Sequence, residues 1–327
     1  MQAGFPIDLL TLVRCCIDAG ELKSASLEPI IVDGSVQCAV CSREYSIAQG
    51  ILKLLGPRAM HPESLKEQRV RDVRNQAVLD GTRPEWSSRL SDAVEVVPTL
   101  RALALVPGVV VNELGCGAGR YTLALARVAS AVVAVDFSVA GLLVIREKLE
   151  PSARVALVQA DVTEPYGAPR AFDRVLSTLH SNLPGRDHRM ASLRHVANTL
   201  ADGGRAVISM HHYSVRDVLL GVPAAGRYPG SGIYRYHMTG REARRESLPF
   251  FERLRFTHVG TVIPRVNSAA MARAAGRVPL LRSALSQLLL GVVEGPRRPP
   301  DVDHLAGTTR FVARLARLLV RRQVVAE

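Results

Sequence analysis

Short apolar runs alternate with helix-like stretches between about residue 95 and residue 215. The apolar runs span residues 109–111, 132–136, 155–162, 172–177 and 206–210. The segments between them place apolar and polar residues at helical spacing. Strands that alternate with helices in this way form a mostly parallel sheet with helices on both faces. We therefore expect an α/β fold with a Rossmann-like sheet in this part of the chain.

The segments on either side of this pattern read differently. Residues 1–57 are expected to form a small β-rich module, with a hairpin over 30–36 built on Asp33 and Gly34. Residues 58–95 are charged and predict a helical linker from Glu63 to Leu79. The remaining domain, 96–327, is expected to contain a Gly-, Pro- and Tyr-rich lid, a weak strand, an amphipathic helical insertion, and a final strand or basic helix. These four segments are placed at about 211–250, 251–262, about 267–293 and 308–322.

A glycine-rich turn follows the first apolar run of the sheet. Glu113 precedes Gly115, Gly117 and Gly119, and a helix-like stretch begins two residues later. A strand, a glycine turn and a helix in this order let the backbone approach a ligand closely. The Gly-x-Gly-x-Gly spacing differs from the dinucleotide fingerprint. It resembles the first motif of class I S-adenosylmethionine (SAM) methyltransferases.

The resemblance extends through the later strands, since the second and third apolar runs each end in an acid. It implies that Asp136 accepts hydrogen bonds from the ribose hydroxyls of SAM, that Phe137 packs beside the adenine, and that Asp161 accepts from the adenine amino group. Residues 58–95 would lie over the cofactor. The full set of cofactor-binding residues implied by the resemblance is Glu113, Gly115, Cys116, Gly117, Gly119, Asp136, Phe137, Asp161, Val162, Ser177 and Leu179.

Three histidines follow the fourth and fifth strands, where an acceptor would meet the cofactor. His180 comes after the fourth strand, and His211 and His212 after the fifth. Imidazole suits general-base chemistry because its ordinary pKa lies near neutrality. Each histidine is therefore a candidate base, with a polar wall residue as the alternative role.

The N-terminal module carries four of the five cysteines of the chain. Cys38 and Cys41 have the spacing of a zinc-binding turn, whereas the same spacing from Cys15 ends at Asp18. The module resembles the zinc ribbons that precede some bacterial methyltransferases, and the activator protein of tRNA methyltransferases. Two alternatives stay open: zinc bound by Cys15, Asp18, Cys38 and Cys41, or a ribbon that has lost its metal.

The chain of 327 residues carries a formal net charge of +12, concentrated in its C-terminal third. Residues 201–327 hold 20 Arg, no Lys and nine acidic residues. Such a segment suits nucleic acid or another acidic partner, although an arginine bias throughout the chain gives the same count. No apolar run is long enough to span a membrane, and no secretory leader is recognised, so a cytoplasmic location is expected.

Three functions remain in contention on the sequence alone. The first is a SAM-dependent methyltransferase that acts on a small-molecule biosynthetic intermediate. The second is an RNA methyltransferase, acting on ribosomal or transfer RNA, which the ribbon and the basic C-terminal third would suit. The third is a catalytically silent SAM-binding partner of another enzyme. The sequence leaves the acceptor, the methylated atom and the oligomeric state undetermined.

Overall fold

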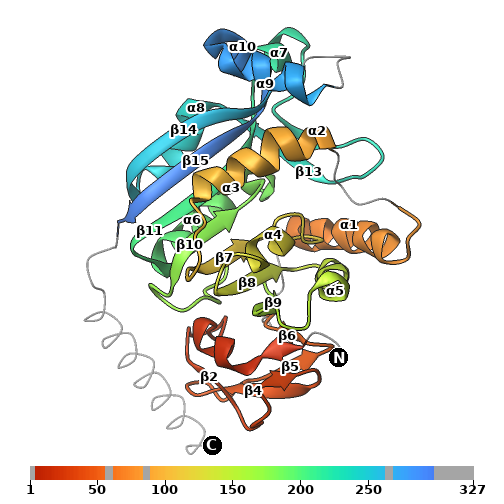
Figure 1. Cartoon of the computed structure of the whole chain (residues 1–327), viewed down its shortest axis with the longest axis vertical. Helices are drawn as coiled ribbons and strands as arrows, with labels where there is room; N and C mark the ends of the chain where they lie inside the picture. Colours follow the sequence, from red (N-terminus) through yellow and green to blue (C-terminus); the bar gives the residue numbers. More distant parts are fainter. Residues whose placement is uncertain (1–3, 56–61, 84–88, 262–267, 298–327) are drawn as a thin grey trace, which may run out of the picture. The chain divides into compact units, whose positions relative to one another are not determined.

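The structure is a computed structural model that describes residues 4–55, 62–83, 89–261 and 268–297 (Figure 1). Its centre is a sheet whose strands β9, β8, β7, β10 and β11 lie parallel to one another in that order. Their bounds are Val155–Gln159, Ala131–Asp136, Val110–Leu114, Phe172–Ser177 and Leu200–His212. The α/β fold class and all five strands expected from the apolar runs are confirmed.

Two antiparallel strands extend the sheet beyond β11. Strand β15 (Ser286–Pro296) pairs with β11, and β14 (Phe251–Thr261) pairs with β15. The weak strand expected over 251–262 is thus present. Strand β8 is buried along its whole length because both faces of the sheet are covered. This explains why the strand reads as a continuous apolar run.

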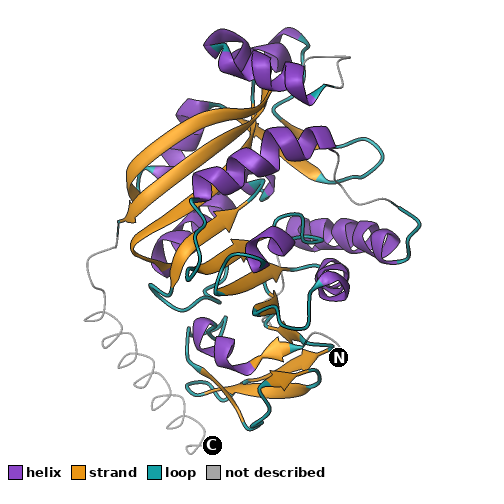
Figure 2. Cartoon of the chain, viewed as in Figure 1, coloured by secondary structure: helices purple, strands orange, loops and turns teal. Residues whose placement is uncertain are grey.

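Helices cover both faces of the central sheet (Figures 1 and 2). Helix α1 packs against α5, and the Asn75 amide donates a 3.0 Å hydrogen bond to the Ser138 hydroxyl. The helix expected from Glu63 to Leu79 is present as α1. The helical bounds up to β11 are α1 Pro62–Leu79, α2 Arg89–Ser91, η2 Asp92–Val96, α3 Val97–Leu103, α4 Thr122–Ala126, α5 Val139–Lys148, η3 His180–Asn182 and α6 Arg186–Thr199.

The N-terminal β-rich region is joined to the central sheet. Strand β6 pairs in parallel with β9, and β5, β4 and β2 continue outward from β6. A short 3₁₀ helix, η1, lies between β1 and β2. The bounds of these elements are β1 Phe5–Pro6, η1 Ile7–Leu12, β2 Leu22–Ser24, β3 Ile30–Ile31, β4 Gly34–Cys38, β5 Glu44–Ala48 and β6 Ile51–Lys53.

The hairpin expected over 30–36 is wrong. Strand β3 pairs with β1, whereas β4 pairs with β2 and β5. The Asp33 carboxylate instead accepts a 2.9 Å hydrogen bond from the backbone NH of Gln49. Asp33 and Gly34 therefore mark a crossing between two sheets, because a turn signal does not determine which strands pair across it.

The segment expected to be a lid, about 211–250, contains regular structure in addition to loops. Its elements are α7 Val215–Leu219, β12 Ala225–Arg227, β13 Tyr234–Met238 and α8 Gly240–Ser247. Strand β13 pairs with the last two residues of β11, whose opposite edge is held by β15 at His211. Strand β10 pairs with the other edge of β11 up to Ile208. The β12–β13 hairpin follows β10 along that same edge, beyond the end of β10.

The helical insertion expected over about 267–293 is wrong in its second half. Helices α9 (Ala269–Arg277) and α10 (Pro279–Leu285) end where β15 begins. The apolar residues after Ser286 lie between β11 and β14, and a fully buried strand cannot be distinguished from a buried helix by periodicity. The final strand or basic helix expected at 308–322 lies outside the described residues. None of the helices that the structure describes is long and apolar enough to cross a membrane.

Candidate functional site

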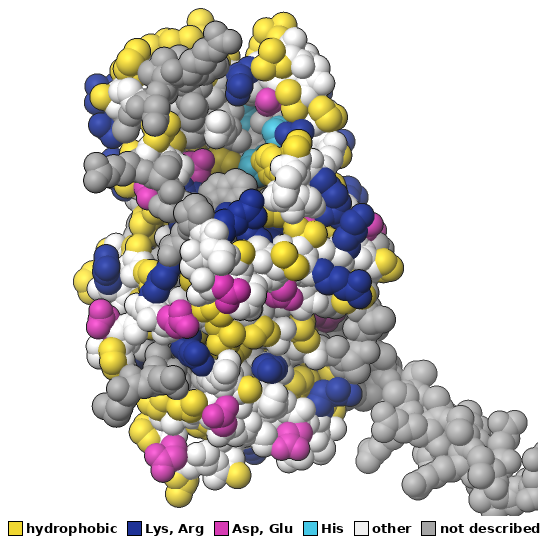
Figure 3. Space-filling model, turned by 90° about the vertical axis from the view of Figure 1, so that its right-hand side faces the viewer, with side chains coloured by type: hydrophobic (Ala, Val, Ile, Leu, Met, Phe, Trp, Pro, Cys, Tyr) yellow, Lys and Arg dark blue, Asp and Glu magenta, His cyan; other side chains and the backbone are white. Residues whose placement is uncertain are grey.

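A cavity of about 930 Å³ opens at the carboxyl ends of the parallel strands. Ligands of open α/β sheets bind at this edge, and the volume lies in the upper part of the range for small-molecule sites. The residues after β7, β8, β9 and β10 form one part of its wall, and those after β11 form another. Figure 3 shows histidine side chains within a hollow of the molecular surface, next to basic side chains.

The glycine turn shapes the cavity directly after β7. Gly115, Gly117 and Gly119 line it and have φ angles of +72°, +55° and +87°. Side chains are strained in this left-handed conformation. A Cβ on Gly119 would also lie 2.7 Å from Ile145 of α5. Backbone geometry therefore favours glycine at all three positions, and packing against α5 favours it at Gly119 as well.

Asp136, at the end of β8, joins the turn to the next strand. Its carboxylate accepts hydrogen bonds from the backbone NH groups of Gly117, at 2.9 Å, and Ser138, at 2.8 Å. The side chain lines the cavity and is 7% exposed, and burial raises its pKa. One carboxylate thus fixes the glycine turn and presents its remaining lone pairs to the cavity.

The other residues proposed to contact the cofactor after β8, β9 and β10 also line this cavity. They are Phe137, Asp161, Val162, Ser177 and Leu179. The Asp161 carboxylate accepts hydrogen bonds from the NH and hydroxyl of Thr163 at 2.9 and 2.7 Å. Together with Gly115, these residues are up to 64 positions apart in the chain, and the structure brings them to one cavity.

Glu113 and Cys116 are two buried members of this set. Glu113 is not among the residues that line the cavity, and its carboxyl group accepts a 2.7 Å hydrogen bond from the Thr122 hydroxyl. Burial raises the pKa of Glu113 to about 8, so the group is mostly protonated at neutral pH. Cys116 lines the cavity, but burial raises the pKa of its thiol well above the ordinary value.

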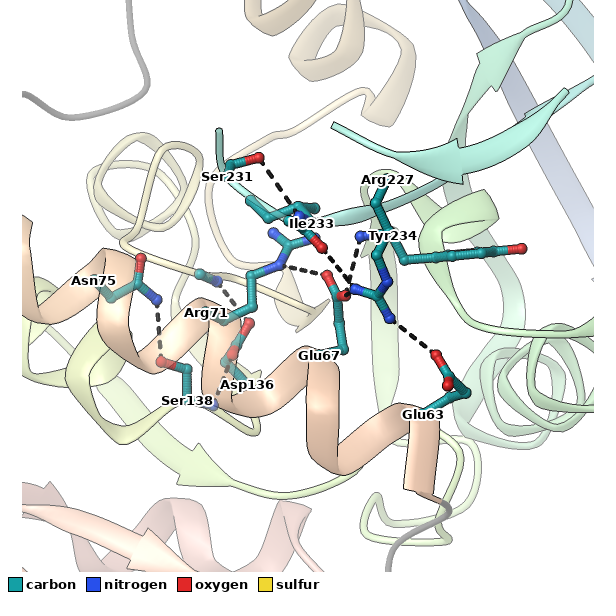
Figure 4. Close-up of polar contacts among 12 residues, drawn as sticks. Glu63, Glu67, Arg71, Asn75, Asp136, Ser138, Arg227, Ser231, Ile233 and Tyr234 are labelled. Carbon is teal, nitrogen blue, oxygen red and sulfur yellow. Dashed lines mark hydrogen bonds and ion pairs between the residues drawn. The ribbon is translucent and has the colours of Figure 1, made fainter. Parts of the chain in front are cut away.

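Helix α1 supplies cavity residues that sequence reasoning did not single out (Figure 4). The buried Glu67 carboxylate pairs with Arg71, at 3.1 Å, and with Arg227 of β12, at 3.1 Å. It also accepts a 3.0 Å hydrogen bond from the backbone NH of Tyr234. These contacts join α1 to the β12–β13 hairpin across the cavity. The sequence analysis predicted only that residues 58–95 would lie over the cofactor, and it named none of these contacts.

The first candidate base, His180, is almost completely buried in η3 and lines the cavity. Neither of its ring nitrogens has a hydrogen-bond partner within the described part of the chain. Burial lowers its pKa to about 3, so the ring is neutral at physiological pH.

The two consecutive histidines at the end of β11 face opposite sides of the sheet. The His211 ring stacks on His237 of β13, with ring centroids 5.2 Å apart. The His212 Nδ1 lies 2.7 Å from the Ser286 hydroxyl, and its ring meets His258 edge-on at 4.5 Å. Burial lowers the pKa of His211 to about 3 and that of His212 to about 4. The contacts of His212 tie it to the β14–β15 side, although both rings line the cavity.

His237 is a cavity histidine that the sequence analysis missed. Its Nδ1 lies 3.7 Å from a carboxylate oxygen of Asp217, which also caps α7 by accepting from the Ser214 NH and hydroxyl. The alternation of side chains along β13 does not predict this arrangement. It depends on the pairing of β13 with the end of β11, which sets His237 beside His211.

The four candidate metal ligands of the N-terminal region meet at one point. The ligand atoms of Cys15, Asp18, Cys38 and Cys41 all lie within 4.8 Å of one another. The Cys15 and Cys41 sulfurs are 3.7 Å apart. A tetrahedral zinc site with bonds of about 2.3 Å requires sulfurs about 3.8 Å apart, so this spacing fits the ion. The adjacent Cys16 thiol points away and donates to the Leu54 carbonyl at 2.8 Å.

Comparison with known proteins agrees with this geometry. Residues 111–204 match the family model described as a methyltransferase domain. A demethylmenaquinone methyltransferase of Clavibacter sepedonicus is 36% identical over 118 residues, which cover 36% of this chain and 47% of that protein. The chain therefore spans about half the length of this curated relative.

The similarity to solved structures reaches further along the chain. The DhpI–SAM–HEP complex matches with a TM-score of 0.50 and 17% identity, covering 73% of this chain and all of that one. A SAM-dependent methyltransferase of Mesorhizobium loti matches with a TM-score of 0.47 and 20% identity, covering 64% of this chain and all of that one. Strand order and cavity position agree with these matches: residues 111–204 are similar to a methyltransferase domain, and the fold is Rossmann-like, as in the DhpI structure.

Proposed function

We propose that this protein is a SAM-dependent methyltransferase whose acceptor is a small molecule. One observation carries the proposal: a single cavity is lined in one part by the residues after β7, β8, β9 and β10, and in another part by His211, His212 and His237. We name these parts of the cavity the first and the second chamber. A volume of about 930 Å³ has room for a cofactor and a small acceptor together.

The residues of the first chamber fit the chemical groups of SAM. The glycine turn leaves backbone NH groups accessible, and Asp136 and Asp161 offer acceptor oxygens to ribose hydroxyls and to an amino group. Glu113 would act through the turn that it supports, because it lies behind the cavity wall. Bound SAM supplies a methyl group that its sulfonium has already activated for displacement.

The second chamber would position the acceptor and receive its proton. Methyl transfer is an in-line displacement, so the main tasks of the protein are alignment and control of a proton. His211 and His237 line this chamber as a stacked pair. Burial lowers the pKa of His211 to about 3, so its ring is neutral before the reaction but is a weak base, and its main role would be to position the acceptor. His180 forms another part of the wall. The relative named for demethylmenaquinone supports a small-molecule acceptor.

A small-molecule methyltransferase and an RNA methyltransferase should differ in how their affinity for RNA depends on salt concentration. We expect weak binding to RNA, without preference for a particular sequence, that disappears near physiological salt. An RNA enzyme would neutralise several phosphates with its arginines, and its affinity would fall steeply but remain measurable. Filter binding of ribosomal and transfer RNA at about 50 and about 200 mM salt distinguishes the two.

The control for this measurement is methyl incorporation from labelled SAM into each RNA. Tight, sequence-selective binding accompanied by incorporation would reject the small-molecule proposal in favour of RNA methylation. Binding of SAM without transfer to any RNA or to any of a panel of hydroxylated small molecules would instead favour a silent SAM-binding partner.

We further propose that the N-terminal region binds one zinc ion through Cys15, Asp18, Cys38 and Cys41. Protein purified without chelator should contain about one zinc per chain by elemental analysis. The Cys38→Ser change should remove the ion because structural sites favour thiolate ligands. Cys16→Ser is the matched control and should keep it, since the Cys16 thiol bonds to Leu54 instead. A folded wild-type protein free of metal would reject this site.

A further inference from the structure

The second chamber contains a guanidinium group for which the described residues provide no acidic partner. Arg235 of β13 lines the cavity, and its Nε is buried without a hydrogen-bond acceptor. None of the ion pairs formed among the described residues includes Arg235. The Arg235 side chain is half-buried, and a guanidinium at a cavity wall without an acidic partner is available to an anionic group of a ligand.

Two other arginines of the cavity wall have acidic partners. Arg71 pairs with Glu67 at 3.1 Å. Arg120 pairs with Asp92 at 3.2 Å and Glu95 at 2.8 Å. The charges of these two arginines are thus offset within the protein, which distinguishes Arg235 from them.

The immediate neighbours of Arg235 are aromatic and neutral. Its guanidinium lies 5.1 Å from the Tyr228 ring centroid, and its Nη1 is 3.5 Å from the His237 Nε2. Burial lowers the pKa of both His237 and His211, so these rings are neutral and add no second positive charge beside the guanidinium. The Asp217 carboxylate lies beside the other ring nitrogen of His237, Nδ1, at 3.7 Å, and it accepts a hydrogen bond from the Ser214 hydroxyl.

The position of Arg235 associates it with the acceptor. Its contacts, Tyr228 and His237, belong to the segment after β11, whereas the glycine turn follows β7. Strand β13 lies beyond the end of β10 and places Arg235 on the same face as His237, two residues along the strand. The guanidinium therefore lies in the chamber assigned to the acceptor.

We propose that Arg235 binds an anionic group of the methyl acceptor, such as a carboxylate or the oxyanion of an ionised aromatic or enolic hydroxyl. This inference rests on the proposed methyltransferase function. A guanidinium donates paired, charge-assisted hydrogen bonds to such groups, and Tyr228 provides a flat face beside it. The acceptor is thus an acidic small molecule, and Arg235 determines the specificity for its charge.

The test uses salicylate as an anionic probe and salicylamide as its neutral counterpart. Each is titrated by calorimetry into the full-length protein saturated with S-adenosylhomocysteine, the demethylated form of the cofactor. The wild type should bind salicylate at least about tenfold more tightly than salicylamide, the ratio expected from one charge-assisted hydrogen bond. Arg235→Gln should abolish this preference, and Arg235→Lys should retain part of it.

The control variant is Arg241→Gln, which removes the same charge from an exposed position on α8 and should keep the full preference. Equal binding of the two probes to the wild type, or no millimolar binding of either, would overturn the inference. So would a tenfold loss of S-adenosylhomocysteine affinity in Arg235→Gln, because the anion would then be the carboxylate of the cofactor.

Different measurements test the proposed function and this inference: binding of S-adenosylhomocysteine tests the first, and the preference for salicylate tests the second. If the wild type does not bind S-adenosylhomocysteine, the methyltransferase proposal fails, and the probe titrations are repeated on the protein alone. A preference for salicylate that depends on Arg235 would then still support an anion site. Loss of that preference would reject both proposals.

Discussion

The Asp136→Ala variant is expected to bind S-adenosylhomocysteine about 5- to 150-fold more weakly than the wild type, a loss of about 1–3 kcal/mol. The Asp136 carboxylate is buried at the cavity wall and accepts from the NH groups of Gly117 and Ser138. Its removal deletes the proposed ribose contact and leaves two backbone donors unsatisfied. Calorimetry measures the change against a wild-type affinity expected in the micromolar range, about −8 kcal/mol.

The matched control for this measurement is Asp173→Ala. The Asp173 carboxylate also accepts from a backbone NH, that of Val110 at the opposite end of β7, at 2.8 Å. Its loss should lower stability without changing cofactor affinity, because it lies away from the cavity wall. An Asp136→Ala protein that is folded and binds as well as the wild type would remove Asp136 from the site.

The Glu246→Ala variant is expected to lower the free energy of unfolding by about 3–5 kcal/mol. Glu246 of α8 and Arg189 of α6 form two 2.9 Å hydrogen bonds, and both side chains are at most 5% exposed. The Arg189 guanidinium also lies 4.6 Å from the Tyr236 ring centroid. Removal of the carboxylate leaves a buried guanidinium without its partner. Urea denaturation monitored by circular dichroism provides the measurement.

Two further variants separate this effect from the loss of an ordinary ion pair. Arg253→Ala breaks a pair with Glu294 in which the arginine side chain is 68% exposed, and it should cost less than about 1 kcal/mol. The double variant Arg189→Met with Glu246→Leu should recover much of the stability, since it removes both buried charges. A loss below about 1 kcal/mol in Glu246→Ala would show that the pair is not essential.

The central strands and the glycine turn could be predicted from the sequence because their signals are local. Strand β8 reads as an apolar run since both of its faces are buried, and Gly119 is needed where α5 approaches. Helix α1 was equally predictable from its composition. The roles of Asp136 and Asp161 came from resemblance, and the structure places both residues at the cavity wall.

Strand pairing could not be predicted with the same success. The signal of Asp33 and Gly34 marks a change of direction, but β3 and β4 pair with different strands. The residues after Ser286 were interpreted as helical, whereas they form β15 between β11 and β14. In both cases the local sequence is compatible with several partners, and the choice depends on distant segments.

The sequence by itself determined the five central strands, the glycine turn and the four candidate metal ligands. Only the tertiary structure decided which side chains line the part of the cavity proposed for the acceptor. His237, Asp217 and Arg235 meet there because β13 pairs with the last two residues of β11, which aligns His237 with His211. No local pattern specifies that register. The chemistry of the second chamber therefore depends on this long-range pairing, whereas each residue proposed for the first follows directly after a strand that the sequence predicts.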